Sequence, residues 1–147
     1  MTSPRGEAAP RYGGARTGLP PRKYDDVRSW FRRAVAEHEF LLSELADYEL
    51  RRELLRINSR HSLRRLDELT RELRYVPVTT ATWRATARLW AEQRRAGRPT
   101  GDGLDGDLLL AVQAREELAA VVTLNEKHFS GLVDVLSPTA VPMSTPA

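Results

Sequence analysis

The stretch RPTGDGLDGDLLLAVQAREELAAVVTLNEKHF, residues 98–129, is the most informative part of this chain about its fold. Its first part carries three aspartates, Asp102, Asp105 and Asp107, followed at once by residues 108–118, which are apolar on most sides. Because a helix that is apolar all round is a buried helix, we expect the acids at the N-terminus of a core helix. There the exposed backbone N–H groups and the helix dipole stabilise a carboxylate.

The same stretch then predicts a strand at residues 119–123, and alternating strands and helices extend on its N-terminal side. Residues 40–42 and 75–78 are expected to be strands, the second at a sheet edge because it contains Pro77. Apolar residues at helical spacing predict helices over 25–37, 43–57, 63–73 and 79–97, with Ser43 and either Thr79 or Thr80 as N-caps. The alternation indicates an α/β fold, a parallel sheet with helices on both faces.

The two ends of the chain differ from the part between them. Residues 1–23 are rich in Pro, Gly, Ala and Arg and contain no apolar run long enough for a strand, so disorder is expected there. Residues 137–147 form a Pro-rich segment that is expected to be a disordered tail. One domain is therefore predicted over residues 24–136.

Composition narrows the class of protein. The chain has 147 residues, 41% of them apolar, which suits one domain with a core of ordinary size. It has no cysteine, which excludes disulfides and thiolate metal sites and favours the cytoplasm. Since no apolar run approaches the roughly 20 residues of a membrane span, we expect no membrane partner.

Arginine greatly outnumbers lysine and gathers in residues 22–33, 51–74 and 84–98. Such clusters can hold phosphate groups bidentately, which makes nucleic acid an expected partner. The alternative, arginines that are simply solvated on helix faces, explains the pattern equally well.

The three aspartates of the opening stretch allow two interpretations. Helix capping accounts for one of them, and solubility for the others. Three acids within six residues repel one another, however, unless cations or arginines lie near. Their oxygen ligands suit Mg²⁺ or Mn²⁺, which can activate water for phosphodiester hydrolysis.

Three further polar residues stand at or beyond predicted strand ends. Glu49 lies in the apolar arc of its helix, as does Glu53, and an Arg-paired glutamate is the structural alternative. Asn125 follows the 119–123 strand and can bind water or metal through its oxygen, or close a turn. His128 can act as an acid or phosphate contact, although a histidine beside Phe129 is more often packed or capping.

Three motifs in this order resemble those of PIN-domain ribonucleases, of the kind found in VapBC toxin-antitoxin systems. They are LLSELADYELRRELL with Glu49, GRPTGDGLDGDLLLAVQA with Asp107, and VVTLNEKHF with Asn125 and His128. The likeness covers about residues 24–135. It implies a PIN-like three-layer α/β/α fold in which Glu49, Asp107 and Asp105 hold one or two Mg²⁺ or Mn²⁺ ions, with Asn125 as an outer ligand.

One part of the family pattern is missing from the sequence. The family opens with a buried strand ending in an aspartate, whereas residues 1–23 contain neither, and no aspartate precedes Asp25. We therefore expect the first strand to be missing or replaced. A start assigned in the wrong reading frame, a gene decayed by frameshift and a strand supplied by a partner are the competing explanations.

The resulting hypothesis is a metal-dependent endoribonuclease, degenerate or inactive without the first-strand aspartate, and the toxin of a toxin-antitoxin pair. Its expected partners are RNA, an antitoxin and a second copy of the chain. The alternative is a non-catalytic helical module that binds nucleic acid or protein. Trp30, Trp83 and Trp90 can serve a dimer interface if exposed, although core packing is the commoner use of tryptophan at helical spacing.

Overall fold

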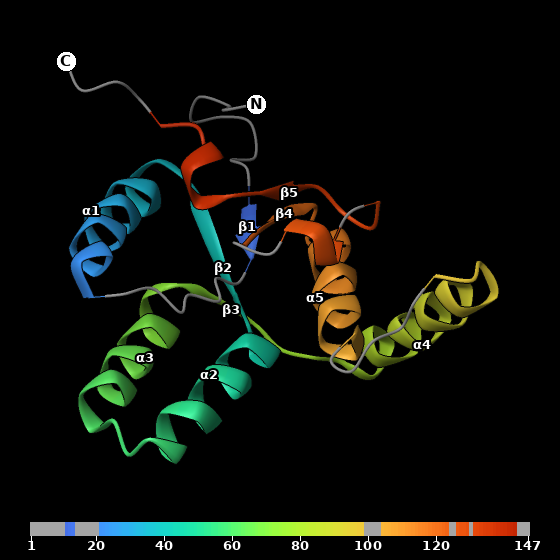
Figure 1. Ribbon diagram of the computed structural model, residues 1–147, viewed down its shortest axis with the longest axis horizontal. Coiled ribbons are helices and arrows are strands. Elements are labelled where there is room, and N and C mark those ends of the chain that lie inside the picture. The colour runs from blue at the N-terminus through green and yellow to red at the C-terminus, as the bar shows by residue number, and fades with distance from the viewer. Residues whose placement is uncertain (1–10, 14–20, 99–103, 124–125, 130, 144–147) are drawn as a thin grey trace.

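A single parallel sheet organises the computed structural model, which describes residues 11–13, 21–98, 104–123, 126–129 and 131–143. The strand order is β3-β2-β1-β4-β5, and each neighbouring pair is parallel. Figure 1 shows this sheet between two groups of helices. The strands are β1 (Arg11–Gly13), β2 (Glu39–Ser43), β3 (Arg74–Val76), β4 (Ala119–Val122) and β5 (Val135–Leu136).

Five α-helices connect the strands, and the predicted caps begin two of them. Ser43 Oγ accepts a hydrogen bond from the Leu45 amide, and Thr79 Oγ1 accepts one from the Thr82 amide. Both hydroxyls thus satisfy amides that a helix start leaves unpaired. The helices are α1 (Pro21–Glu37), α2 (Glu44–Arg56), α3 (Arg60–Glu72), α4 (Thr80–Arg95) and α5 (Leu104–Glu116), with short 3₁₀ turns η1 (Glu126–Phe129) and η2 (Pro138–Ala140).

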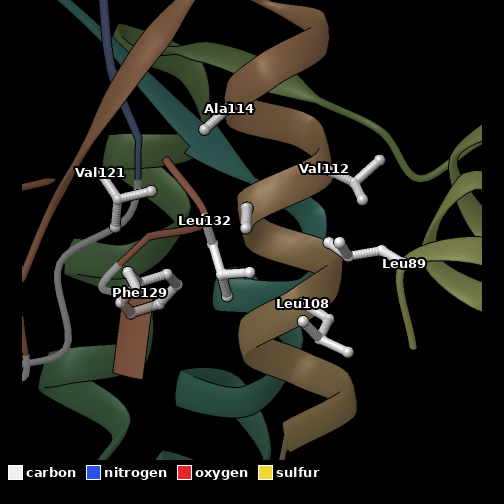
Figure 2. Close-up of a cluster of buried hydrophobic side chains, with 8 residues drawn as sticks. Leu89, Leu108, Val112, Ala114, Val121, Phe129 and Leu132 are labelled. Atoms are coloured by element: carbon white, nitrogen blue, oxygen red, sulfur yellow. The ribbon is translucent and has the colours of Figure 1, made fainter. Parts of the chain in front are cut away.

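One face of the sheet packs against α5. Val121 on β4 lies in a buried cluster that joins β4, α5, α4 and η1, which we call the α5 core (Figure 2). A fully buried leucine or valine contributes about 1.5–3 kcal/mol, so this cluster is the main apolar contribution on this face. Its buried members are Leu89, Leu108, Ala111, Val112, Ala114, Val121, Phe129 and Leu132.

The opposite face packs against α1. Side chains alternate along a strand, so Val122 points away from the α5 core and packs with Ala34 and Phe40. Trp30 and Phe31 of α1 surround Phe40, with ring centroids 6.1 and 5.7 Å from it. Helices thus cover both faces, which confirms the predicted three-layer fold.

Helices α2 and α3 form an arm, residues 44–72, that carries little apolar core. α2 has no buried residue and α3 has one, Leu66. Figure 1 shows the two helices beside each other at the end of the sheet where β2 runs into α2. The apolar arc of α2 is therefore only half-buried, at Leu45, Ala46 and Leu54, and Leu50 of the same arc is exposed.

Polar contacts hold this arm instead. Arg51 binds Asp47 at 2.9 Å and Asp67 at 2.8 Å, which ties α2 to α3. The Tyr75 hydroxyl donates to Asp47 Oδ2 at 3.0 Å, which ties α2 to β3. Burial, together with this contact, raises the pKa of Tyr75 to about 12.

The expectation that residues 1–23 contain no strand was wrong for Arg11–Gly13. This short segment is β1 and pairs with β2 on one side and β4 on the other. Backbone hydrogen bonds to two neighbours satisfy its peptide groups, so its position does not require an apolar sequence. The strand is replaced rather than missing, and α1 also begins within this region, at Pro21.

The expected disordered tail was wrong for residues 137–143. η2 lies in this segment, and Val141 is buried against the α1 side of the sheet. His38 Nε2 lies 2.5 Å from the carbonyl oxygen of Pro142, which fixes the segment to the junction of α1 and β2. Within the described ranges, no helix has the length and apolar character needed to cross a membrane.

Candidate active site

The carboxyl ends of β2 and β3 are joined to α5 by a buried glutamine. Ser43 Oγ donates to Gln113 Oε1 at 2.5 Å, and Gln113 Nε2 donates to the Val76 carbonyl at 3.1 Å. A buried polar side chain is tolerated because these bonds satisfy it. Sequence reasoning missed Gln113, although a single amide within the apolar run 108–114 was a visible signal.

Asp105 and Asp107 both lie in the first turn of α5, because the helix begins at Leu104, earlier than predicted. Asp105 is exposed, whereas Asp107 is buried, with its side chain 12% exposed. The N-terminal end of the helix dipole favours a negative charge at both positions. Only Asp107, however, is held within the protein.

Asp107 is held by His128. The His128 Nδ1 atom lies 2.9 Å from Asp107 Oδ2, so the ring donates to the carboxylate. The buried Phe129 next to it anchors η1 in the α5 core, and this brings His128 to α5. The His128 side chain itself is 55% exposed, which shows that it is not a packed core histidine.

The second carboxylate oxygen of Asp107 has no hydrogen-bond partner among the described residues. The imidazole of His128 orients one oxygen, and no described donor binds the other. The second oxygen can therefore bind a cation. Its oxygen chemistry fits a hard divalent cation such as Mg²⁺ or Mn²⁺.

Glu49 lies on α2, half-buried, one and a half turns after the carboxyl end of β2. Like Glu49, the other acids of α2 interact with other residues of the protein. Glu44 Oε2 accepts from the Val78 amide at 2.6 Å, and Asp47 binds Arg51 and Tyr75. Glu53 is exposed and pairs with Arg56, whose hydrogen bond lowers the pKa of Glu53. Arginine pairing is thus present at Glu53, and for Glu49 it stays a prediction.

A complete metal centre is not formed by the described residues alone, in which no three His, Asp or Glu side chains gather as a metal-binding group. Asp102 and Asn125, two of the candidate residues, lie outside the described ranges. The Asp107 carboxylate thus has the chemistry that a divalent cation needs. That Glu49, Asp105 and Asn125 are further ligands stays a prediction.

The fold is similar to that of several solved structures. VapBC-1 from nontypeable Haemophilus influenzae matches with a TM-score of 0.66 and 18% identity, covering 88% of this chain and 98% of that chain. DNA-bound VapBC from Salmonella typhimurium matches with a TM-score of 0.67, 18% identity and the same two coverages. VapBC2 from Rickettsia felis, bound to a promoter DNA fragment, matches at 0.63 and 19% identity, covering 86% and 98%.

No curated protein sequence matches the chain. The family model of the PIN domain, in contrast, matches residues 20–132, which is most of the chain. This match spans α1 to η1 and includes the positions of Glu49, Asp107 and His128. The chain belongs to the PIN-domain family.

Proposed function

We propose that this chain is a metal-dependent endoribonuclease and the toxin of a toxin-antitoxin pair. The PIN family match and the similar VapBC structures support the nuclease class at the level of the family. The observation that carries the proposal for this chain is the buried Asp107 carboxylate. It lies at the start of α5, with one oxygen oriented by His128.

In the proposed site, Glu49 and Asp107 hold Mg²⁺ or Mn²⁺, Asp105 contributes a further carboxylate and Asn125 is an outer ligand. A bound divalent ion would supply a Lewis acid for the phosphodiester and a water of lowered pKa. Asp107 is the best positioned ligand, because α5 is fixed on the sheet by Gln113 and by the α5 core. Asp105, being exposed, is expected to contribute less.

His128 acts on Asp107 in this proposal. By donating from Nδ1 to Oδ2, it holds the carboxylate plane and leaves the other oxygen for the cation. Hydrogen bonds of this kind to a metal ligand orient it, and losing them typically costs metal affinity about 10–100-fold. We therefore expect His128→Ala to weaken metal binding without unfolding the domain, since the ring is half exposed.

The test is cleavage of single-stranded RNA by the purified chain in Mg²⁺ or Mn²⁺. Glu49→Gln and Asp107→Asn should each lower the rate by about 100-fold or more, because each removes a ligand that stabilises charge in the transition state. Glu53→Gln is the matched control on the same helix and should leave the rate unchanged. Equal rates for wild type and the double variant Glu49→Gln/Asp107→Asn would remove the assignment.

The second candidate function is a non-catalytic PIN protein that binds nucleic acid. Two observations favour it: the described residues contain no three-ligand group, and strand β1 (Arg11–Gly13) contains no aspartate. Binding of RNA in EDTA, steeply dependent on salt, combined with no cleavage in either metal, would select this function.

The antitoxin is tested separately from the chemistry. Induced expression of the wild-type chain in a bacterial host should arrest growth, Asp107→Asn should not, and co-expression of the cognate antitoxin should relieve the arrest. Equal growth arrest by wild type and Asp107→Asn would separate toxicity from the proposed site.

A further inference from the structure

Helix α4 presents an exposed face that the candidate site does not use. Trp83 and Trp90 are 55% and 39% exposed, although tryptophan is usually well buried. The guanidinium of Arg94 lies over the Trp90 ring, 4.9 Å from its centroid. In contrast, Trp30 packs within the α1 side of the sheet, so the exposed tryptophans of the described chain are both on α4.

The exposed residues of α4 form two stripes along the helix. At about 100° per residue, Trp83, Trp90 and Arg94 fall within about 40° of one another and form an aromatic stripe. Arg84, Arg88 and Arg95 fall within another arc of about 40° and form a basic stripe. The small side chains of Ala87 and Ala91 lie between the stripes, and the opposite side of the helix, with Thr82, Thr86 and Leu89, is buried.

Helix α4 and the three residues after it are strongly basic. Residues 80–98 contain five arginines and one glutamate, a net charge of +4, whereas the whole chain has a net charge of +3. The other 128 residues therefore have a net charge of −1. The three arginines of the basic stripe are exposed and make no ion pair with any described residue.

We infer that this face of α4 binds single-stranded RNA, with bases stacked on Trp83 and Trp90 and phosphates on Arg84, Arg88 and Arg95. Single strands are bound by aromatic side chains that take bases and a basic surface that follows the backbone, and α4 carries both in adjacent stripes. This inference extends the proposed function, because it assigns the substrate a binding surface outside the metal site.

The position of α4 relates this surface to the candidate site. Thr82, at the start of α4, donates to Glu116 at the end of α5, at 2.9 Å. Leu89, two turns further along α4, packs instead near Leu108 and Val112 (Figure 2). The Trp90 end of the stripes is thus the end closer to the part of α5 that begins with Asp107, so a strand on α4 can lead to the site.

A second copy of the chain fits this face less well. Tryptophan and arginine are frequent in protein interfaces, but two α4 helices, each with four arginines and one glutamate, would bring like net charges of +3 together, which opposes pairing. Charge complementarity therefore favours a polyanion, and the two tryptophans favour one with exposed bases over a duplex.

The test measures binding of a fluorescently labelled 12-nucleotide single-stranded RNA in EDTA, where metal-dependent cleavage is absent. Arg84→Ala/Arg88→Ala/Arg95→Ala should weaken binding and lower the slope of log Kd against log salt by about 2, as expected for three lost phosphate contacts. The control Arg60→Ala/Arg64→Ala/Arg65→Ala removes the same charge from the exposed face of α3 and should keep the wild-type slope.

The tryptophans separate base stacking from simple charge attraction. Trp83→Ala/Trp90→Ala should weaken single-strand binding roughly tenfold or more and leave the salt slope unchanged. Trp83→Phe/Trp90→Phe should restore most of the binding, and circular dichroism checks that each variant is folded. Wild-type affinity in the alanine pair, or equal losses in the α3 control and the α4 triple variant, would overturn the inference. So would a dimer that the tryptophan changes convert to monomer without any effect on RNA binding.

Failure of the nuclease proposal and failure of the α4 binding surface give different experimental results. If RNA is not cleaved but binding depends on both α4 stripes, the metal-dependent function falls and the binding surface stands. If Glu49 and Asp107 prove essential for cleavage while the α4 variants bind RNA as wild type does, the metal-dependent function stands and the α4 binding surface falls.

Discussion

Asp107 and Glu49, the two main residues of the candidate site, lie in parts of the molecule that are stabilised in opposite ways. Asp107 lies in the first turn of α5, and the next residue, Leu108, is completely buried in the α5 core. Glu49 lies on the α2–α3 arm, where α2 buries no residue and polar contacts join the helices. A metal site formed by both residues would have one ligand on the well-packed helix α5. Its other ligand would lie on the α2–α3 arm, whose local unfolding is expected to cost less free energy.

The largest difference between the regions is expected from removal of a leucine in each. Leu108→Ala should lower the free energy of unfolding by about 2–5 kcal/mol, because it leaves a cavity in a packed core. Leu55→Ala on the arm, where the side chain is 60% exposed, should change it by less than about 0.5 kcal/mol. Urea unfolding followed by circular dichroism measures both, and equal losses would remove the distinction.

A smaller effect is expected from the polar contacts of the arm. Asp47→Ala removes the bonds to Arg51 and Tyr75 and should cost about 1–3 kcal/mol, since hydrogen bonds to a charged, mostly buried group are lost. The matched control is Glu53→Gln, which breaks an exposed pair with Arg56 and should leave stability unchanged within error. If both changes have the same effect in urea unfolding, the arm does not depend on this network.

The smallest effect concerns high pH. Burial and then the Asp47 contact raise the pKa of Tyr75 to about 12, so the folded protein holds this proton more tightly than the unfolded chain does. The contribution to stability is fully present below about pH 10, the ordinary pKa of tyrosine, and is lost as the pH rises through about 12. Unfolding in urea over this range should show the loss in wild type.

Tyr75→Phe should remove this alkaline loss of stability. The control is Tyr48→Phe, which changes an exposed tyrosine of the same arm and should keep the wild-type pH dependence. Were the two variants to respond to high pH alike, Tyr75 would not be the group responsible.

Much of the fold followed from local sequence chemistry. The caps at Ser43 and Thr79, and the edge position of β3 with Pro77 after it, depend on residues within a few positions of one another. Such features are predictable because the interaction that causes them is local. The alternation of helices and strands then led to a parallel sheet with helices on both faces.

Features that depend on distant partners were not predicted. Arg11–Gly13 becomes a strand because β2 and β4 pair with its backbone, and no property of its side chains indicates this. The sequence of α2 shows an apolar arc, but nothing in the helix itself indicates that no residue of this arc becomes fully buried. In each case tertiary context overrides local pattern.

The candidate site also combines features that the local sequence indicates with features that depend on distant partners. The family resemblance singled out Asp107 and left His128 with several interpretations, and their contact across 21 positions became visible only in the folded chain. Gln113, which fixes α5 to two strand ends, lies within the Asp107 motif, but its partners on β2 and β3 could not be read from the sequence.

Binding of Mn²⁺, measured by isothermal titration calorimetry, tests most directly whether the two regions together form a metal centre. Wild type and Glu53→Gln should bind Mn²⁺ with the same affinity, whereas Asp107→Asn and Glu49→Gln should each weaken binding by about tenfold or more. Wild-type affinity in Glu49→Gln, with or without a loss in Asp107→Asn, would contradict a site shared between α5 and the arm.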